Sequence, residues 1–131
     1  MLLTTGDAET SVGGGGVSFC IITDGRRPAL LLEELDSIRV LGLPTFEIIV
    51  AGHLSADLRS TLSSQSFLRT VSASELAYAG RLGALRNAAC SAAQYETLVV
   101  ADDDMLFHPE CAAVLEGVRA DDVVCFLLVG V

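Results

Sequence analysis

The sequence predicts an α/β fold with a mostly parallel sheet and helices packed on its faces. Short runs of apolar and β-branched residues alternate along the chain with longer segments whose apolar residues recur at helical spacing. One of the short runs ends directly in three aspartates, Asp102, Asp103 and Asp104. Strands that alternate with helices form parallel sheets, which bind ligands at the carboxyl ends of their strands. The pattern therefore indicates both a fold class and a place for a site.

Five segments have the apolar, β-branched character of buried strands. They are residues 17–23, 45–51, 67–71, 97–101 and 123–129. Pro28 suits the first turn of a helix, and Gly42 ends that helix. Ser55 is placed to cap a short second helix. Residues 80–93 and 109–118 complete the predicted helices, although Gly83 weakens the first of these two.

The chain is expected to contain one structured domain. Residues 1–16 end in four consecutive glycines, which do not hold a fixed conformation cheaply, so we predict a flexible leader there. These glycines precede the first strand, whereas a phosphate-binding loop follows one. Residues 17–131 form the α/β domain, and because the chain stops just after an apolar strand, we expect that domain to be incomplete.

Composition excludes several classes of protein. No apolar run approaches the roughly 20 residues that a membrane-spanning helix needs, and the N-terminus lacks a secretory signal, so a cytoplasmic location is expected. The four cysteines include no C-x-x-C pair, which argues against structural zinc and favours small buried side chains.

Negative charge is concentrated around the aspartate triplet. The net charge is −9, and residues 101–122 alone carry seven acidic side chains and one arginine. Such a field attracts cations and repels nucleic acid, so no nucleic-acid partner is expected. Three adjacent carboxylates are tolerated either around a cation or in full contact with water. The triplet is therefore either a cation site or a solvated acidic turn.

Four segments carry a resemblance to a known family. They are Ser18–Thr23, Phe46–Val50, Gly83–Ala88 and Leu98–Asp104. In order and spacing they resemble the N-terminal half of a GT-A glycosyltransferase of the family 2 type. The resemblance covers residues 17–131 and implies a Rossmann-like sheet. It also implies that a C-terminal half, with the acceptor site and the general base, is missing.

The resemblance implies a metal-dependent site for a nucleoside diphosphate sugar. Asp102 and Asp104 match the D-x-D motif and would bind Mg²⁺ or Mn²⁺, with Asp102 alternatively contacting the ribose. Asp103 would contribute hydrogen bonds or charge. A hard divalent cation held by oxygen ligands offsets the charge of the departing diphosphate.

The resemblance also implies further substrate-binding residues. Arg86 and Asn87 match an Arg-Asn pair of the family, and Arg86 would pair either with phosphate or with the aspartate cluster. Arg81 is a second candidate for contacting phosphate. Thr23, Asp24 and Gly25 would line the pocket for the base and ribose. His53 stands where many members place an aspartate that reads uracil, so either His53 or the backbone would read the base.

These matches leave alternatives open. We expect the 131-residue chain to bind nucleotide weakly and to transfer no sugar to an acceptor. It is alternatively a non-catalytic nucleotide-binding module or, less favoured, a nucleotidyltransferase, a class that usually carries a glycine-rich basic loop where residues 23–27 hold one glycine. Arg26 and Arg27 are expected to be a surface pair, with contact to a phosphate at the start of the helix that begins at Pro28 as the alternative. Glu33, Glu34 and Asp36 are expected to form a solvated helix face.

Overall fold

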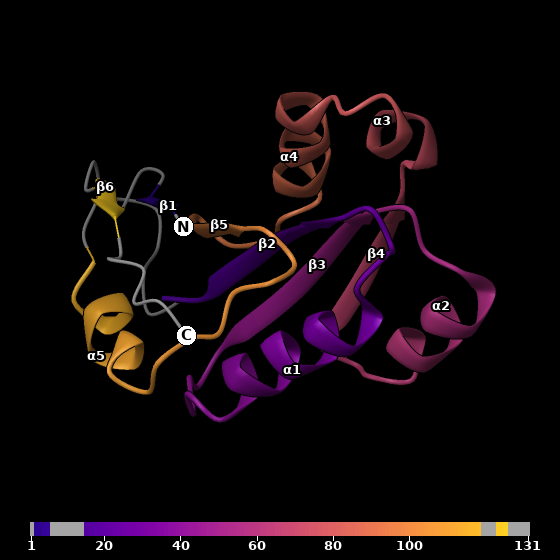
Figure 1. Cartoon of the computed structure of the whole chain (residues 1–131). Helices are drawn as coiled ribbons and strands as arrows, with labels where there is room; N and C mark the ends of the chain where they lie inside the picture. Colours follow the sequence, from indigo (N-terminus) through magenta and orange to yellow (C-terminus); the bar gives the residue numbers. More distant parts are fainter. Residues whose placement is uncertain (1, 6–14, 119–122, 126–131) are drawn as a thin grey trace.

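A six-stranded sheet in the order β4-β3-β2-β5-β1-β6 organises the chain (Figure 1). The computed structural model describes residues 2–5, 15–118 and 123–125. Strands β4, β3, β2 and β5 are parallel, and β1 is antiparallel to both β5 and β6. The strands are β1 (Leu2–Thr5), β2 (Val17–Thr23), β3 (Phe46–Gly52), β4 (Leu68–Ser72), β5 (Thr97–Ala101) and β6 (Val123–Cys125). This arrangement confirms the predicted Rossmann-like α/β class.

Helices cover both faces of the sheet (Figure 1). They are α1 (Pro28–Arg39), α2 (Ala56–Ser63), α3 (Ser74–Tyr78), α4 (Leu82–Ser91) and α5 (Cys111–Glu116). Pro28 begins α1, and the hydroxyl of Ser55 accepts a hydrogen bond from the backbone N–H of Leu58, so both predicted helix starts are confirmed. None of these helices is long and apolar enough to cross a lipid bilayer.

Alternate residues of the strands pack into two separate cores, as the two-residue period of a strand requires. Phe19, Ile48 and Val99 face the side covered by α1, α2 and α5. Cys20 and Ile49 face the side covered by α3 and α4. The central strands are apolar on both faces, which is the pattern of a buried parallel sheet. As predicted, Cys20 and Cys111 are buried small side chains, whereas Cys90 is only partly buried.

Several boundaries differ from the prediction. Residues 2–5 form β1, so the predicted leader includes a strand, and most of the remaining leader (residues 6–14) lies outside the described residues. Helix α3 was not predicted, and α4 begins at residue 82 because Gly80 has a φ of 67°. Helix α5 begins two residues after Pro109. The predicted last strand continues to residue 129, and residues 126–129 also lie outside the described part.

The strand order determines where a ligand can bind. From β2 the chain proceeds outward through β3 to β4, and it then returns to the other side of β2 to form β5. Ile21 pairs with Ala101 and Thr23 pairs with Gly52, so β2, β3 and β5 end at one edge. A crevice forms at such a switch point because the flanking connections leave in opposite directions.

A buried carboxylate joins strands at the opposite edge of the sheet. Glu47 Oε2 accepts hydrogen bonds from Ser18 Oγ and from the backbone N–H of Gln94, both at 2.6 Å. Its other oxygen, Oε1, pairs with Arg69 at 2.6 Å. Burial raises the pKa of Glu47, but these three donors outweigh burial and leave the pKa below its ordinary value. The ionised carboxylate therefore stabilises the fold.

We expect Glu47→Ala to lower the free energy of unfolding by about 3 kcal/mol, because three buried or half-buried donors lose their acceptor. Urea denaturation at pH 7 measures this change. The matched control is Glu33→Ala, which removes an exposed carboxylate on α1 and is expected to change stability by less than about 0.5 kcal/mol. Equal effects of the two substitutions would contradict a structural role for Glu47.

Candidate functional site at the carboxyl edge of the sheet

A pocket of about 220 Å³ lies where β2 and β5 end. Its lining combines apolar residues with charged ones: Ile22, Thr23, Asp24, Arg27, Ala77, Leu82, Leu85, Asp102 and Asp103. The apolar part comes mainly from α3 and α4, whereas most of the polar part follows the two strands. The pocket therefore occupies the predicted place, and it brings together Thr23, Asp24 and two of the three aspartates.

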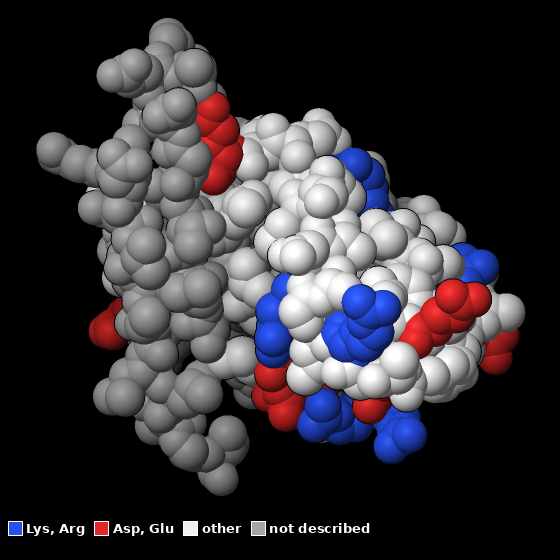
Figure 2. Space-filling view, turned by 90° about the horizontal axis from the view of Figure 1, so that it is seen from above, with Lys and Arg blue, Asp and Glu red and all other residues white. Residues whose placement is uncertain are grey.

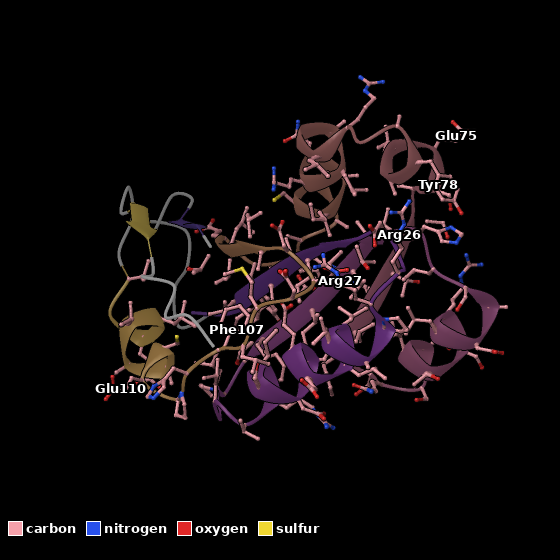
Figure 3. The ribbon with its side chains drawn as sticks, in the orientation of Figure 1. Arg26, Arg27, Glu75, Tyr78, Phe107 and Glu110 are labelled. Atoms are coloured by element: carbon pink, nitrogen blue, oxygen red, sulfur yellow. The ribbon has the colours of Figure 1, made fainter. Side chains whose placement is uncertain are left out.

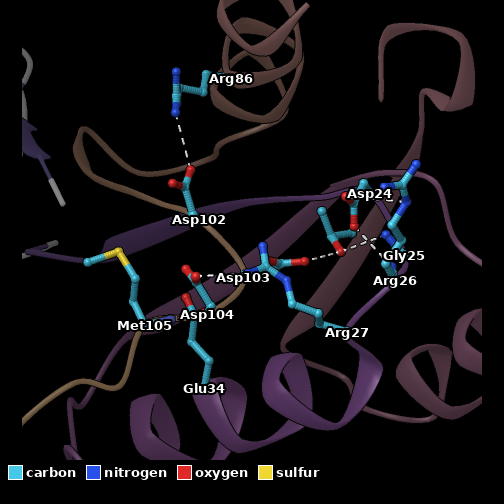
Figure 4. Close-up of polar contacts among 11 residues, drawn as sticks. Asp24, Gly25, Arg26, Arg27, Glu34, Arg86, Asp102, Asp103, Asp104 and Met105 are labelled. Carbon is cyan, nitrogen blue, oxygen red and sulfur yellow. Dashed lines mark hydrogen bonds and ion pairs between the residues drawn. The ribbon is translucent and has the colours of Figure 1, made fainter. Parts of the chain in front are cut away.

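Asp103 is the buried member of the triplet, with 2% of its surface exposed. Its Oδ2 accepts a hydrogen bond from Thr23 Oγ1 at 2.7 Å, and its Oδ1 pairs with Arg27 Nη2 at 2.7 Å (Figure 4). Burial raises the pKa of Asp103, although Thr23 and Arg27 act in the opposite direction. The charge on Asp103 in turn raises the pKa of Arg27. One buried carboxylate thus connects the ends of β2 and β5 with the start of α1.

Two glycines make this close arrangement possible. Gly52 has a φ of 141°, and a Cβ there would lie 1.8 Å from the carbonyl oxygen of Thr23. Gly25 has a φ of 80°, and its backbone N–H donates to Thr23 Oγ1 at 3.0 Å. Both positions therefore require a residue without a side chain. Thr23 can then bond Gly25 and Asp103 with a single hydroxyl.

Asp102 and Asp104 are exposed on either side of Asp103. Asp104 Oδ2 pairs with Arg27 Nη1 at 3.0 Å, and Asp102 Oδ1 pairs with Arg86 Nη2 of α4 at 3.2 Å (Figure 4). The Arg86 contact agrees with the expectation that this arginine meets either phosphate or the aspartates. All three members of the triplet are paired with arginine, so the triplet is not a fully solvated turn.

Helix α1 holds the segment that follows the triplet. Glu34 Oε1 accepts from the backbone N–H of Met105 at 3.1 Å, and Ser37 Oγ accepts from the N–H of Phe107 at 3.0 Å. Glu34 has no exposed surface, and burial raises its pKa to about 9. Its side chain is thus protonated at neutral pH. Its Oε2 has no hydrogen-bond partner among the described residues.

The remaining predicted residues lie around this centre. His53 Nδ1 is 3.0 Å from Ser74 Oγ, and the His53 ring packs against Tyr78 with ring centroids 4.9 Å apart. Arg81 and Asn87 are exposed at the start of α4 and on its surface. No hydrogen bond or ion pair within residues 15–118 joins either of them to the aspartates. Neither belongs to the pocket lining.

One site residue was misjudged from the sequence, and another was only partly described. Arg27 is exposed, as expected of a surface pair with Arg26, but it also binds two aspartates (Figure 3). Glu34 was expected on a solvated face, but it is buried because it lies on the same face of α1 as Leu31, Leu35 and Ile38. That helical spacing was a usable signal for Glu34. The signal for Arg27 was weaker: it lies between the end of β2 and Pro28, at the edge where the strands end.

The side chains at this edge fit a hard divalent cation. Asp102 and Asp104 present exposed carboxylate oxygens, each of which is paired with an arginine (Figure 4). Oxygen ligands suit Mg²⁺ and Mn²⁺. Within the described ranges, no three acidic, histidine or cysteine side chains converge as a cage for a metal. Mg²⁺ commonly binds one or two carboxylates together with substrate phosphates, and these residues suit that mode.

Charge on the molecular surface is locally balanced. On the face that carries α3 and α4, arginine and acidic side chains are interspersed around a largely uncharged area (Figure 2). The local pairing explains how a chain of net charge −9 tolerates four carboxylates, Asp24 and the triplet, at one edge.

A search against protein-family models, curated proteins and solved structures found no match for this chain.

We expect Glu34→Gln to stabilise the protein at alkaline pH. The native protein keeps a proton that the unfolded chain releases at about pH 4.3, so the stability contributed by protonated Glu34 declines as the pH rises toward 9. Glutamine reproduces the neutral side chain at every pH. Urea denaturation should give similar stabilities at pH 4 and a gain above about 1.4 kcal/mol at pH 8. The exposed control Glu33→Gln should show no such pH dependence, and a pH-independent difference for Glu34→Gln would contradict the assignment.

We expect Asp103→Ala to destabilise the fold by about 2–3 kcal/mol, because Thr23 and Arg27 lose a buried partner. Asp102→Ala is the comparison: it removes the same group from an exposed position and should cost less than about 1 kcal/mol. Thermal unfolding at pH 7 ranks the two variants. A larger loss for Asp102→Ala would mean that Asp103 is not the structural member of the triplet.

Proposed function

We propose that this chain binds a nucleoside diphosphate sugar, together with Mg²⁺ or Mn²⁺, in the pocket between the ends of β2 and β5. The observation that carries the proposal is the convergence of Thr23, Asp24, Arg27, Asp102 and Asp103 on one pocket at the switch point of the sheet, with Asp104 joined to this group through Arg27. Binding there would serve sugar transfer of the glycosyltransferase family 2 type. The acceptor and the catalytic base are not assigned to residues of this chain.

In this proposal the exposed aspartates hold the cation and the arginines contact phosphate. Asp104 and Asp102 offer the accessible oxygens, while buried Asp103 keeps its bonds to Thr23 and Arg27. The bound cation would offset the negative charge that develops on the diphosphate as it leaves the sugar. Arg86 lies beside Asp102 and can pair with a phosphate oxygen through its planar guanidinium group.

The size of the pocket indicates which part of the ligand it takes. Sites for small organic ligands usually have volumes of about 300–1,000 Å³, so a pocket of about 220 Å³ accommodates the diphosphate and the ribose rather than the whole molecule. The base then extends toward the ends of β2 and β3. There, the paired rings of His53 and the exposed Tyr78 offer an aromatic surface.

Titration calorimetry with UDP- and GDP-sugars tests the proposal. We expect binding in the presence of Mn²⁺ that EDTA abolishes, and at least a tenfold loss of affinity in Asp104→Asn. The matched control is Asp57→Asn, the same substitution at an exposed position in the first turn of α2, which should leave binding unchanged. The proposal is wrong if neither nucleotide sugar binds with Mn²⁺ present, or if EDTA leaves binding intact.

A further inference from the structure

Arg27 connects two carboxylates that differ in their surroundings. Its Nη2 pairs with Asp103, whose side chain is 3% exposed, and its Nη1 pairs with Asp104, whose side chain is 42% exposed. The Asp103 contact is the shorter of the two, at 2.7 Å against 3.0 Å, and that carboxylate is also held by Thr23. The guanidinium group is therefore anchored at one end and accessible at the other.

The two ion pairs of Arg27 are expected to break in a definite order, the pair with Asp104 before the pair with Asp103. Exposed ion pairs contribute little to stability because water and salt screen them, whereas breaking a buried pair leaves an uncompensated charge. A competing cation would consequently displace Arg27 from Asp104 before it disturbs the pair with Asp103. Arg27 also lines the pocket, so its released end stays beside the space that a ligand would occupy.

The surroundings single out Arg27 as the competitor for Asp104. Arg86 pairs with Asp102, and Arg26 lies 3.9 Å from Asp24 on an exposed surface. Among the described residues, Arg27 is the one base that pairs with Asp104. Glu34 supports the same loop from the opposite side, with a fully buried carboxyl group whose Oε2 has no donor within the described part of the chain. Arg27 is therefore the group that a cation would displace from Asp104.

We propose that Arg27 is a tethered substitute for the divalent cation. In the unliganded protein it occupies Asp104, and a cation that binds Asp104 releases Nη1, which then binds a phosphate oxygen of the diphosphate. The pair with Asp103 persists throughout and serves as the pivot. The inference rests on the proposed function, because it assigns to one residue the coupling between cation and diphosphate at that site.

The proposal predicts effects of opposite sign when Arg27 is removed. Arg27→Gln should bind Mn²⁺ alone about two- to fivefold more tightly than Arg26→Gln, because the competing ion pair is lost. It should also bind pyrophosphate in the presence of Mn²⁺ at least tenfold more weakly than Arg26→Gln. The comparison is matched, since both variants lose one positive charge from adjacent positions. A residue that only stabilises the fold would not strengthen one ligand while weakening the other.

Electron paramagnetic resonance of free Mn²⁺ measures the first affinity, and titration calorimetry with pyrophosphate measures the second. The proposal is overturned if the Mn²⁺ affinities of Arg27→Gln and Arg26→Gln agree, or if Arg27→Gln retains the pyrophosphate affinity of the control. An Arg27→Gln variant that binds Mn²⁺ when the wild-type protein binds none supports the proposal. Failure of both to bind Mn²⁺ counts against it.

A double variant covers the case in which Arg27→Gln does not fold. Arg27→Gln combined with Asp103→Asn removes the unpaired buried charge and restores the wild-type net charge. It should bind Mn²⁺ more tightly than wild type, and equal or weaker binding overturns the proposal. The outcome is separable from the proposed function. Tighter Mn²⁺ binding without any affinity for nucleotide sugars refutes only the function, whereas nucleotide-sugar binding with unchanged Mn²⁺ affinity refutes only the role of Arg27.

Discussion

The burial of Asp103 is the constraint on which the arrangement of this edge depends. A carboxylate almost without exposed surface must have partners, and its partners come from the end of β2 and the residue before α1. Thr23 can reach Asp103 because Gly25 and Gly52 leave room for the backbone around it. Asp102 and Asp104 remain exposed and pair with Arg86 and Arg27, so the triplet presents two accessible carboxylates and one buried one.

Helix α1 has two roles that its amphipathic pattern combines. Its apolar side chains cover one face of the sheet, while Glu34 and Ser37 accept backbone hydrogen bonds from the segment that follows the aspartates. The course of that segment is therefore coupled to the packing of a helix more than sixty residues earlier in the chain. The loop is positioned by the rigid part of the fold, which is what a binding site for a compact, charged ligand requires.

The electrostatics of the edge reflect local compensation more than net charge. The protein is strongly acidic, yet each member of the triplet meets an arginine, and burial keeps Glu34 protonated at neutral pH. Arginine suits the pairing of these carboxylates because its planar guanidinium group can donate hydrogen bonds to two carboxylates at once. It can bind a phosphate group in the same geometry. In the proposed binding mode, a divalent cation would replace Arg27 as the positive partner of Asp104, and a phosphate group would replace Asp104 as the negative partner of Arg27.

The sequence by itself determined the α/β class, the four parallel strands and the edge at which the aspartates emerge, because these follow from local periodicity and from the rule that parallel strands end together. It also determined the starts of α1 and α2 through Pro28 and Ser55. The tertiary structure alone decided that residues 2–5 pair with β5, that Asp103 is the buried aspartate, and that Arg27 and Glu34 belong to the site. Each of these depends on contacts between residues 70 or more positions apart, and local pattern carries no information about which distant groups will satisfy a buried charge or an open strand edge.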